Sequence, residues 1–441
     1  MKKIYLLLII CFSYKLSAQI INFPDANFKA SLLSANASNS IASNEIPSIN
    51  DTVQTWNAID TNGDGEIQIS EAQNVRWLNL SYLQNPLSDL TGIEYFTNLM
   101  YINITYYNQF VNIDFSQNTS LVTIICQSNY QLVNINLSGL VNLKRIYLSY
   151  TGLTSLDLSS NTAIEKIYCT NSQLQNLELG YKPNLTFLEC NSNHLTNLDV
   201  SNAPNLQTLK CSINQISDIN LNSNTHLATL WLNNNAISNI DLTENTDLET
   251  LWINNNQLTS INISQNVLLN HLRIYNNLLS SLDCGNNINL NYLLCYDNQL
   301  IYIILKNGNS VWDQLDFSNN DALRYICVDI DEYNYVQQKV NNLANSALCS
   351  VNDYCTFSPG GPFYEIFGNT KYDSNNNGCD INDINYSDLR FSITDGTNFG
   401  HLISDQSGSY FIPVQGGSHT ITPILENPDY FNISPTSFTV G

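Results

Sequence analysis

The sequence is poor in charged residues, and above all in basic ones. Only 12% of its 441 residues are charged, and 16 Lys and Arg stand against 38 Asp and Glu, which gives a formal net charge of -22. A protein that binds nucleic acid needs a basic face to neutralise phosphates, and outside the extreme N-terminus the bases form no run. The composition argues against nucleic acid as a partner, and against an anionic membrane surface for the same reason.

Hydrophobic runs long enough to span a membrane are also missing. The apolar run from Ile4 to Phe12 follows Lys2 and Lys3 and precedes the small residues Ser17 and Ala18, an order typical of a secretory signal peptide. Its length of about nine residues is roughly half of a bilayer span, which argues against the alternative of a membrane anchor. We predict that residues 1–18 are removed and that the rest is secreted or held at the cell surface.

Histidine is scarce, and common catalytic motifs are lacking. The five His residues are scattered and stand in no HExxH or nucleophile-elbow pattern, so we expect no enzymatic activity. Ten Cys residues remain after residue 18. Export permits disulfides but does not by itself predict them.

The chain is rich in a repeat of 21 residues. The segments that begin at Leu230 and Leu251 align without a gap, with aliphatic residues or Cys at offsets 0, 2, 7, 10, 12 and 18. The same register starts at Ile146, Ile167, Leu188, Leu209, Leu272 and Leu293, and looser copies start at Leu78, Ile102 and Ile124. We expect about twelve rungs, with a half-length insertion at Lys306 to Asp316 before a last strand at Ile326. Each unit predicts a short strand with an apolar edge that only stacking can bury.

The pattern LxxLxLxxNxL in these units resembles the leucine-rich repeat in its short bacterial, internalin-like form, over residues 74–328. A smaller copy within each unit, such as LTSLDLSSN at Leu153 to Asn161, predicts strand-like pairs on both sides of each coil. The resemblance implies a repeat solenoid, mainly β. It also implies a concave strand face that binds proteins or glycans, and it implies no catalysis.

Two inward columns of the repeat are polar or contain sulfur. Offset 5 carries Asn193, Asn214, Asn235, Asn256, Asn277 and Asn298, whose amides can bond the backbone of neighbouring rungs. Offset 2 carries Cys126, Cys169, Cys190, Cys211 and Cys295. We favour buried free thiols over a disulfide ladder, because five Cys cannot all pair and parallel side chains on adjacent strands make poor disulfide geometry.

The outward side of the strands is rich in aromatic residues. In the offset-1 column and beside it, the candidate ligand-binding residues are Tyr147, Tyr168, Trp231, Trp252, Arg273, Tyr275, Tyr292 and Tyr296. Aromatic residues and Arg dominate the energetics of protein interfaces, and flat aromatic faces also suit sugar rings. The alternative is that these aromatics only stack along the sheet.

A second outward column, at offset 11, is acidic. It reads Asp157, Glu178, Asp199, Asn220, Asp241, Asn262 and Asp283. We favour a solvated edge over a cation-binding ladder.

The segment Asp60 to Glu71, DTNGDGEIQISE, fits D-x-[DN]-x-[DN]-G-x5-E at every fixed position. It resembles the calcium loop of an EF-hand, which surrounds a hard cation with six or seven oxygens. This resemblance implies Ca2+ ligands at Asp60, Asn62, Asp64, Glu66 (backbone carbonyl), Gln68 and Glu71, with Gly65 at the turn and Ile67 as apolar anchor. The alternative is an acidic turn without metal.

We predict that residues 19–73 form an EF-hand-like, partly helical cap over the N-terminal end of the repeats. Two helices are expected in it, one at Pro24 to Leu33 and a short one at Asp51 to Ile59 that enters the loop, followed by a short exit at Ser70 to Val75. A single exposed loop of this kind is expected to bind Ca2+ weakly, with a Kd on the order of 10⁻⁴ to 10⁻³ M.

The period ends after Val328, and residues 329–362 are expected to form a C-terminal cap and linker. The pattern from Tyr333 to Leu348 is helical, and SPGGP at Ser358 to Pro362 is a linker. One disulfide is expected among Cys327, Cys349 and Cys355, most simply between Cys327 and Cys349.

Residues 363–441 contain short alternating runs separated by turns, which predicts a small antiparallel β-sandwich. Its segment YDSNNNGCDIND resembles the calcium loops of B-type (CNA-B-like) modules in bacterial serine-aspartate-repeat adhesins. The resemblance implies Ca2+ ligands at Asp373, Asn375, Asn377, Asp380 and Asp383 around Gly378. A solvated turn is the alternative.

The sequence thus predicts a secreted or cell-surface, monomeric, non-enzymatic protein that binds Ca2+ and an extracellular protein or glycan through the concave face. The alternative is a structural spacer or stalk without a specific ligand.

Overall fold

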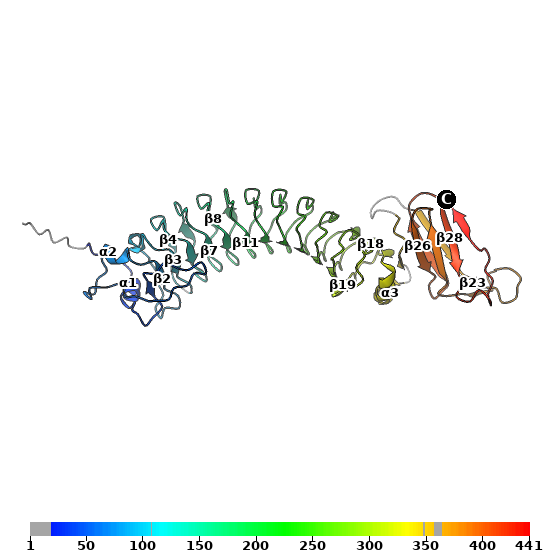
Figure 1. Cartoon of the computed structure of the whole chain (residues 1–441), viewed down its shortest axis with the longest axis horizontal. Helices are drawn as coiled ribbons and strands as arrows, with labels where there is room; N and C mark the ends of the chain where they lie inside the picture. Colours follow the sequence, from blue (N-terminus) through cyan, green and yellow to red (C-terminus); the bar gives the residue numbers. More distant parts are fainter. Residues whose placement is uncertain (1–18, 107, 347–348, 357–363) are drawn as a thin grey trace, which may run out of the picture. The chain divides into compact units, whose positions relative to one another are not determined.

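The computed structural model describes residues 19–106, 108–346, 349–356 and 364–441 (Figure 1). They form two compact units, one that ends at Leu153 and one that spans Thr154–Gly441. The predicted signal peptide (residues 1–18) and the linker Ser358 to Pro362 lie outside the described residues. In the part of the chain that is described, no helix combines the length and the apolar character needed to cross a bilayer.

The first unit consists of a cap and a stack of coils. Helix α1 (Ala26–Leu33) confirms the expected N-terminal helix. Its N-cap Asp25 accepts the N–H groups of Asn27 and Phe28, which satisfies two donors that the first helical turn leaves free. The remaining elements are β1 (Ala42–Ser43), α2 (Ile69–Ala72), β2 (Trp77–Asn79), η1 (Ile93–Tyr95), β3 (Tyr101–Asn103), β4 (Asn112–Asp114), β5 (Thr123–Ile125), β6 (Asn134–Asn136) and β7 (Arg145–Tyr147). Strands β2, β3, β5 and β7 pair in parallel, β1 is antiparallel to β2, and β4 pairs with β6.

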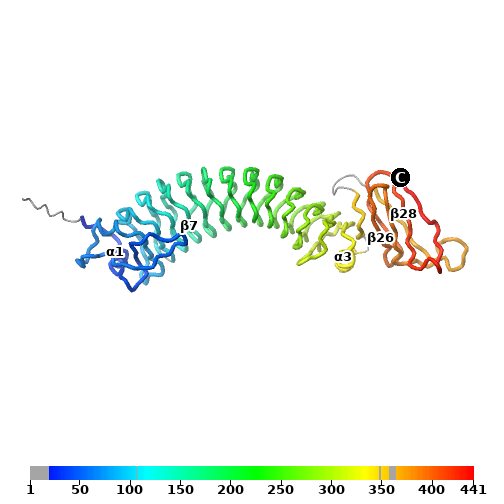
Figure 2. Tube along the Cα trace, viewed as in Figure 1, coloured from blue at the N-terminus to red at the C-terminus, as the bar shows by residue number. Residues whose placement is uncertain are grey.

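The second unit contains a longer stack of coils, which follow one another in chain order (Figure 2). Its main sheet has the parallel, in-register order β9-β11-β12-β13-β14-β15-β17-β19. These strands are β9 (Lys166–Tyr168), β11 (Phe187–Glu189), β12 (Thr208–Lys210), β13 (Thr229–Trp231), β14 (Thr250–Trp252), β15 (His271–Arg273), β17 (Tyr292–Leu294) and β19 (Gln314–Asp316). The middle residue of each strand from β11 to β17, such as Leu230 or Leu251, is fully buried, which confirms the predicted register of the solenoid.

A second set of short parallel strands occupies the other half of the coils. It comprises β8 (Ser155–Asp157), β10 (Asn176–Glu178), β16 (Ser281–Asp283), β18 (Tyr302–Ile304), β20 (Tyr325–Cys327) and β21 (Ser350–Asn352). Strands β8 and β10 pair, and β16-β18-β20-β21 form a four-stranded sheet. These pairs confirm the strand-like second half of the repeat.

The prediction for the end of the repeat is wrong in one respect. The expected insertion, Lys306 to Asp316, contains β19, which pairs with β17 in the main sheet. The expected last rung at Ile326 lies in β20, which pairs with β18 in the second sheet. Both kinds of strand carry the same short apolar pattern, so the residue types alone did not separate them.

The Asn column at offset 5 forms the backbone-bonding ladder that was predicted. Asn256, for example, donates through Nδ2 to the carbonyl oxygens of Leu232 and Ile253, each at 3.0 Å, and its Oδ1 accepts the N–H of Ile237 at 3.0 Å. One amide thus ties its own bend to the rung before it, and this satisfies peptide groups that the buried turn leaves without a partner.

A second asparagine ladder was not predicted, although a column of Asn at offset 15 is visible in the sequence. Each of Asn224, Asn245, Asn266 and Asn287 is fully buried and donates through Nδ2 to carbonyl oxygens 24 and 21 residues earlier. At the same offset in an earlier rung stands Lys182, which is also fully buried. Its Nζ donates to the carbonyl oxygen of Leu158, 24 residues earlier, at 2.8 Å, and to that of Leu179.

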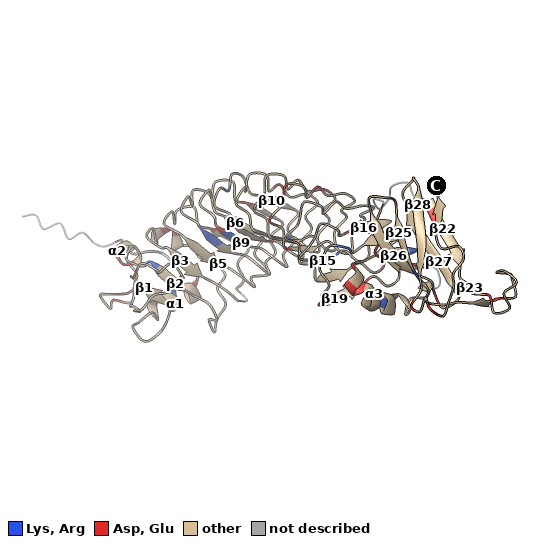
Figure 3. Cartoon of the chain, turned by 45° about the vertical axis from the view of Figure 1, so that its right-hand side comes forward, with Lys and Arg blue, Asp and Glu red and all other residues tan. Residues whose placement is uncertain are grey.

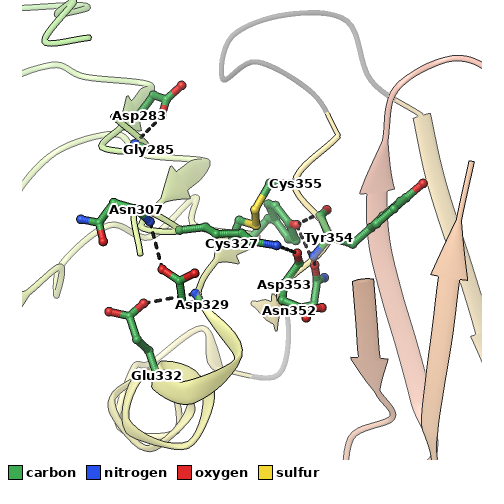
Figure 4. Close-up of a disulfide and its surroundings, with 12 residues drawn as sticks. Asp283, Gly285, Asn307, Cys327, Asp329, Glu332, Asn352, Asp353, Tyr354 and Cys355 are labelled. Atoms are coloured by element: carbon green, nitrogen blue, oxygen red, sulfur yellow. Dashed lines mark hydrogen bonds between the residues drawn. A yellow bond between two sulfur atoms is a disulfide. The ribbon is translucent and has the colours of Figure 1, made fainter. Parts of the chain in front are cut away.

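The cysteines within the repeats are free thiols, as predicted, but the disulfide after the repeats has a different partner from the one expected. Cys126, Cys169, Cys190, Cys211 and Cys295 are buried free thiols, and burial raises the thiol pKa of Cys126 to about 12. The disulfide joins Cys327 to Cys355, with Cα atoms 5.8 Å apart, and not to Cys349 (Figure 4). The register of β20 and β21 explains the error. Tyr325 pairs with Ser350 and Cys327 with Asn352, so Cys349 lies beside the start of β20, away from Cys327. The chain that follows Asn352 brings Cys355 to Cys327, at the end of β20.

The chain after the repeats forms a short helix and an antiparallel module. Helix α3 (Tyr333–Val340), which follows η2 (Ile330–Glu332), is shorter than predicted because two Asn residues, weak helix formers, follow it; the expected end at Leu348 lies outside the described residues. The antiparallel strands are β22 (Tyr364–Asn369), β23 (Lys371–Tyr372), β24 (Ile384–Asn385), β25 (Arg390–Thr394), β26 (Phe399–Ile403), β27 (Ser409–Val414), β28 (His419–Ile424) and β29 (Phe438–Val440). The sheet β26-β25-β28-β29 and the pair β22-β27 enclose one apolar core, as predicted.

Candidate functional site

The main-sheet face of the second unit carries most of the aromatic residues that the sequence singled out. This face consists of the first and third residues of the main-sheet strands. Trp231 and Trp252 are register partners on it, and their rings stack with centroids 4.0 Å apart and planes 3° apart. Nζ of Lys210 lies 3.9 Å from the ring centroid of Trp231, and the guanidinium carbon of Arg273 lies 4.1 Å from that of Trp252. We call Lys210, Trp231, Trp252 and Arg273 the tryptophan stack.

Stacking covers the flat faces of both indole rings. Trp231 has Lys210 on one face and Trp252 on the other, and Trp252 has Trp231 and Arg273. The indole Nε1 atoms of both are buried, and neither has a hydrogen-bond partner in the described part of the chain. These half-buried side chains therefore present hydrocarbon edges to solvent, flanked by two cations. A sugar ring that stacks on an aromatic side chain needs an open face, and neither indole offers one.

The other predicted ligand-binding residues lie at varying distances from the tryptophan stack. Tyr292 continues it, because its ring centroid lies 5.3 Å from the guanidinium of Arg273, which also donates to its hydroxyl at 3.3 Å. Tyr275 and Tyr296 form a separate stacked pair, 4.4 Å apart. Tyr168 packs on Phe187, and Tyr147 belongs to the first unit, where burial raises its pKa. Lys210 was not predicted as a site residue, although its place in the offset-1 column next to Trp231 could have indicated it.

In the first unit, the chain itself covers part of the main-sheet face. Asp51 forms a bidentate ion pair with Arg145 of β7, with N–O distances of 2.6 and 3.0 Å, and accepts from Thr123 of β5 at 3.1 Å. Burial, together with the charge of Asp51, raises the pKa of Tyr101 on β3 to about 12. Trp56 contacts Trp77 of β2. The prediction of a short helix at Asp51 to Ile59 is therefore wrong. This segment is irregular, and its residues contact the strands of the main sheet instead.

The segment Asp60 to Glu71, predicted to be a calcium loop, begins with tight turns. Asp60 accepts the N–H of Gly63 at 2.7 Å and of Gly65 at 2.9 Å, and both glycines have positive φ, 71° and 79°, where a side chain would be strained. Ile67 is fully buried, as predicted for the apolar anchor. Its carbonyl accepts the N–H of Ile21 at 2.9 Å. The loop ends in α2 (Ile69–Ala72), which begins one residue before the expected exit segment, Ser70 to Val75, and ends within it.

The polar side chains of this loop converge only in part. Asn62, Asp64 and Gln68 bond one another at 2.9 to 3.0 Å. Glu71 instead accepts from the N–H and the hydroxyl of Thr61 through Oε1 and from the N–H of Gln68 through Oε2. The carboxylate of Glu66 pairs with Lys29 of α1 at 2.6 Å, which leaves only its backbone carbonyl for a cation. Among the described residues, no three His, Cys, Asp or Glu side chains are placed as a ready-made metal cluster.

The second predicted calcium loop lies between β23 and β24. Asp373 accepts the N–H groups of Asn377 and Gly378, and Asp383 accepts that of Asp380. Asn375 accepts from Asn377, and Asn377 donates to Asp380 at 3.4 Å. The ammonium of Lys371 donates to the carbonyl oxygens of Asp380 at 2.8 Å and of Ile381 and Asp383 at 3.3 and 3.4 Å. A protein cation thus already takes carbonyl oxygens of this loop.

The acidic column at offset 11 serves local turns. Asp157, Asp199 and Asp241 each accept the N–H of the residue two positions later. Asp199 and Asp241 also accept the hydroxyl of that residue. These hydrogen bonds hold the pKa of the three carboxyl groups below the usual range. The column therefore has a structural role that needs no cation.

The histidines make separate contacts. His226 pairs with Asp247, His401 with Asp353, and His419 with the hydroxyl of Tyr354. His194 bonds Gln173, and His271 bonds Asn270. Among the described residues, their partners do not bring a nucleophile and a base into one hydrogen-bonded group.

The comparisons with known proteins concern the fold. No family model matches the sequence, and no curated protein matches it. Among solved structures, the functional domain of InlJ from Listeria monocytogenes, described as including a cysteine ladder, is 21% identical over 81% of this chain and 89% of its own, with a TM-score of 0.46. A leucine-rich-repeat protein of Leptospira interrogans is 18% identical over 64% of this chain and 90% of its own, with a TM-score of 0.38.

The internalin InlF of Listeria monocytogenes is 18% identical over 78% of this chain and 100% of its own, with a TM-score of 0.51. At this identity the similarity concerns the fold alone. Together with the in-register coils and their asparagine ladders, it identifies the solenoid as a leucine-rich-repeat fold.

Proposed function

We propose that this chain is a secreted or cell-surface, non-enzymatic protein that binds another protein through the main-sheet face of the second unit. The observation that carries the proposal is the tryptophan stack, in which two half-buried Trp side chains and two cations lie side by side on that face. Trp and Arg are the residue types most often found at the energetic centre of protein interfaces. The stacking of the indole rings favours a protein over a glycan, because their flat faces are already covered.

The rings are also held in place before any partner arrives. Each indole is fixed by its neighbour and by a cation, so little side-chain entropy remains to be lost on binding. The strands below are fixed by in-register pairing on both sides. Such a rigid surface suits binding without rearrangement.

We further infer that the loop Asp60 to Glu71 binds Ca2+ and stabilises the cap. In support, Gly63 and Gly65 adopt the left-handed turns and Ile67 is anchored in the core. A cation would take the oxygens of Asp60, Asn62, Asp64 and Gln68 and the carbonyl of Glu66. Glu71 would join them by giving up its bonds to Thr61. The support is weaker for the second loop, where Lys371 already takes carbonyl oxygens.

Selection of peptides tests the binding surface. A phage-displayed library of random dodecapeptides is selected on immobilised residues 19–441, and the affinity of the recovered peptides is measured for variants. We expect Trp231→Ala with Trp252→Ala to weaken binding at least about tenfold, since each anchor residue typically accounts for 2 kcal/mol or more. The control, Tyr181→Ala with Tyr430→Ala, removes two aromatics that are 61% and 86% exposed and should leave affinity unchanged.

Three other results would contradict the proposal. Equal affinity for parent and Trp variant would place the binding surface elsewhere. Recovery of no peptide, with binding of a glycan array that the Trp variant loses, would favour a glycan ligand. Recovery of neither would favour the spacer. Thermal unfolding of each variant controls for loss of fold.

A further inference from the structure

The two cations of the tryptophan stack have no anionic partner among the residues that the structure describes. In the described part of the chain, no carboxylate lies within 4 Å of Lys210 or Arg273. Glu189, the register neighbour of Lys210, accepts from Asn191 at 3.1 Å instead. Nε of Arg273 is buried and has no hydrogen-bond partner among the described residues, and one of its terminal nitrogens donates to the hydroxyl of Tyr292. Both cations are therefore available to a negatively charged ligand.

Their placement is unusual for this protein, in which acids outnumber bases by 38 to 16. In Figure 3 most of the ribbon carries neither the blue of Lys and Arg nor the red of Asp and Glu. The tryptophan stack contains two bases and no acid, so its charge is positive, whereas the net charge of the chain is -22. Charge complementarity of this kind selects partners and raises association rates.

The first unit shows how such a face receives an acidic segment. Asp51 reaches the main-sheet face of that unit from an irregular stretch of chain, and Arg145 binds its carboxylate through two nitrogens. The contact needs no helix or strand in the segment that supplies the acid. In the second unit, Lys210 and Arg273 lie on the same kind of face, and no carboxylate of a described residue binds them in this way.

From these observations, and resting on the proposed function, we propose that the partner presents an extended acidic segment to the tryptophan stack. The segment crosses strands β12 to β15 and places one carboxylate on Lys210 and another on Arg273. Its apolar atoms lie against the edges of Trp231 and Trp252.

The register fixes the spacing of the two carboxylates. Lys210, Trp231, Trp252 and Arg273 are consecutive register partners, so Lys210 and Arg273 are three strand steps apart, about 14 Å at ~4.8 Å per step. An extended chain advances about 3.3 Å per residue. Two Asp or Glu residues roughly four positions apart span this distance.

The experiment uses the same dodecapeptide selection on residues 19–441 and reads the recovered sequences. We expect enrichment, over the input library, of pairs of Asp or Glu three to five positions apart, and weaker binding at 0.5 M NaCl. Lys210→Gln with Arg273→Gln should weaken binding at least about fivefold, and Arg273→Lys, which keeps the charge, should weaken it less. The matched control is Lys339→Gln with Arg390→Gln, which removes one Lys and one Arg from α3 and β25 and should change nothing.

The outcomes separate this inference from the proposed function. Peptides that need Trp231 and Trp252 but lack the acidic pair, or that bind the Lys210→Gln, Arg273→Gln variant as well as the parent, overturn the inference and leave protein binding in place. Heparin binding that this variant loses, without recovery of acidic peptides, overturns it in favour of a sulfated glycan. Recovery of no peptide overturns both.

Discussion

Lys182 allows a quantitative test of how the second asparagine ladder works. The side chain is fully buried, and its Nζ donates to the carbonyl of Leu158 that the ladder predicts for an Asn at this position. Burial, only partly offset by the charges of Asp157 and Glu178, lowers the pKa of Lys182 to about 8 from a usual value of 10.5. Lys182→Asn should restore the ladder without a buried charge.

The expected effect depends on pH in a defined direction. Below pH 8 the ammonium is charged in both states, and its burial lowers the free energy of unfolding by about 3 kcal/mol, which corresponds to the lowering of its pKa from 10.5 to about 8. Between pH 8 and 10.5 the folded state binds fewer protons than the unfolded state, so this contribution is relieved as the pH rises. We expect Lys182→Asn to be more stable than the parent by up to about 3 kcal/mol at pH 7, with a difference about 2 kcal/mol smaller at pH 9.5.

Urea unfolding followed by Trp fluorescence at pH 7.0, 8.0, 9.0 and 9.5 measures this difference. Burial raises the thiol pKa of Cys169, and a hydrogen bond with Cys211, together with burial, raises the thiol pKa of Cys190. In alkali the folded state therefore keeps protons on these thiols that the unfolded state loses, which lowers the stability of both proteins equally and cancels in the difference. Lys182→Met is the control, since it removes the charge but leaves the carbonyls unpaired. It should show the same pH trend with lower stability than Lys182→Asn. A difference that stays constant from pH 7 to 9.5, or a less stable Asn variant at pH 7, would refute the reasoning.

Three further predictions concern the cap and the end of the repeats. In 1 mM Ca2+ the free energy of unfolding of the parent should be about 0.4–1.4 kcal/mol higher than in chelator, for a Kd on the order of 10⁻³ to 10⁻⁴ M. Glu71→Gln should lose most of the rise in thermal midpoint that Ca2+ causes. No rise in either protein would exclude the site. Asp51→Asn should lower the free energy of unfolding by about 1–3 kcal/mol, because it removes one member of a half-buried bidentate pair; an unchanged urea midpoint would show that the segment contributes nothing to stability. Under oxidising conditions Cys355→Ser should lower the free energy of unfolding by about 3–4 kcal/mol, as expected for a disulfide that closes a loop of 28 residues. Reductant should abolish this difference from the parent. The effect of Cys349→Ser, the control, should not change with reductant.

The sequence was most informative where one environment recurs. Every rung places the same offset in the same surroundings, so the buried Leu of the strands, the free thiols of Cys169 and Cys190 and the ladder Asn256 could be predicted from their columns. The alternation of the C-terminal runs predicted strands for a different reason, namely that successive side chains of a strand point to opposite faces of its sheet. Repetition turns a three-dimensional contact into a fixed spacing along the chain.

Local chemistry also fixed parts of the cap. The Asn-Gly and Asp-Gly turns of the loop at Asp60 depend on backbone freedom within a few residues, and Ile67 follows from the pattern of the loop itself. The sequence did not specify the orientation of Glu71, whose carboxylate accepts from Thr61, ten residues earlier in the chain.

Tertiary structure alone decided the features that join distant residues or break the repeat. The assignment of β19 and β20 to different sheets, and with it the pairing of Cys327 with Cys355, depends on which neighbour each short strand meets. Asp51 reaches Arg145 across 94 residues, a distance that no local pattern reports. The covered faces of Trp231 and Trp252 likewise follow from packing. The sequence shows which residues are aromatic, and their neighbours in space determine which part of each ring remains exposed to solvent.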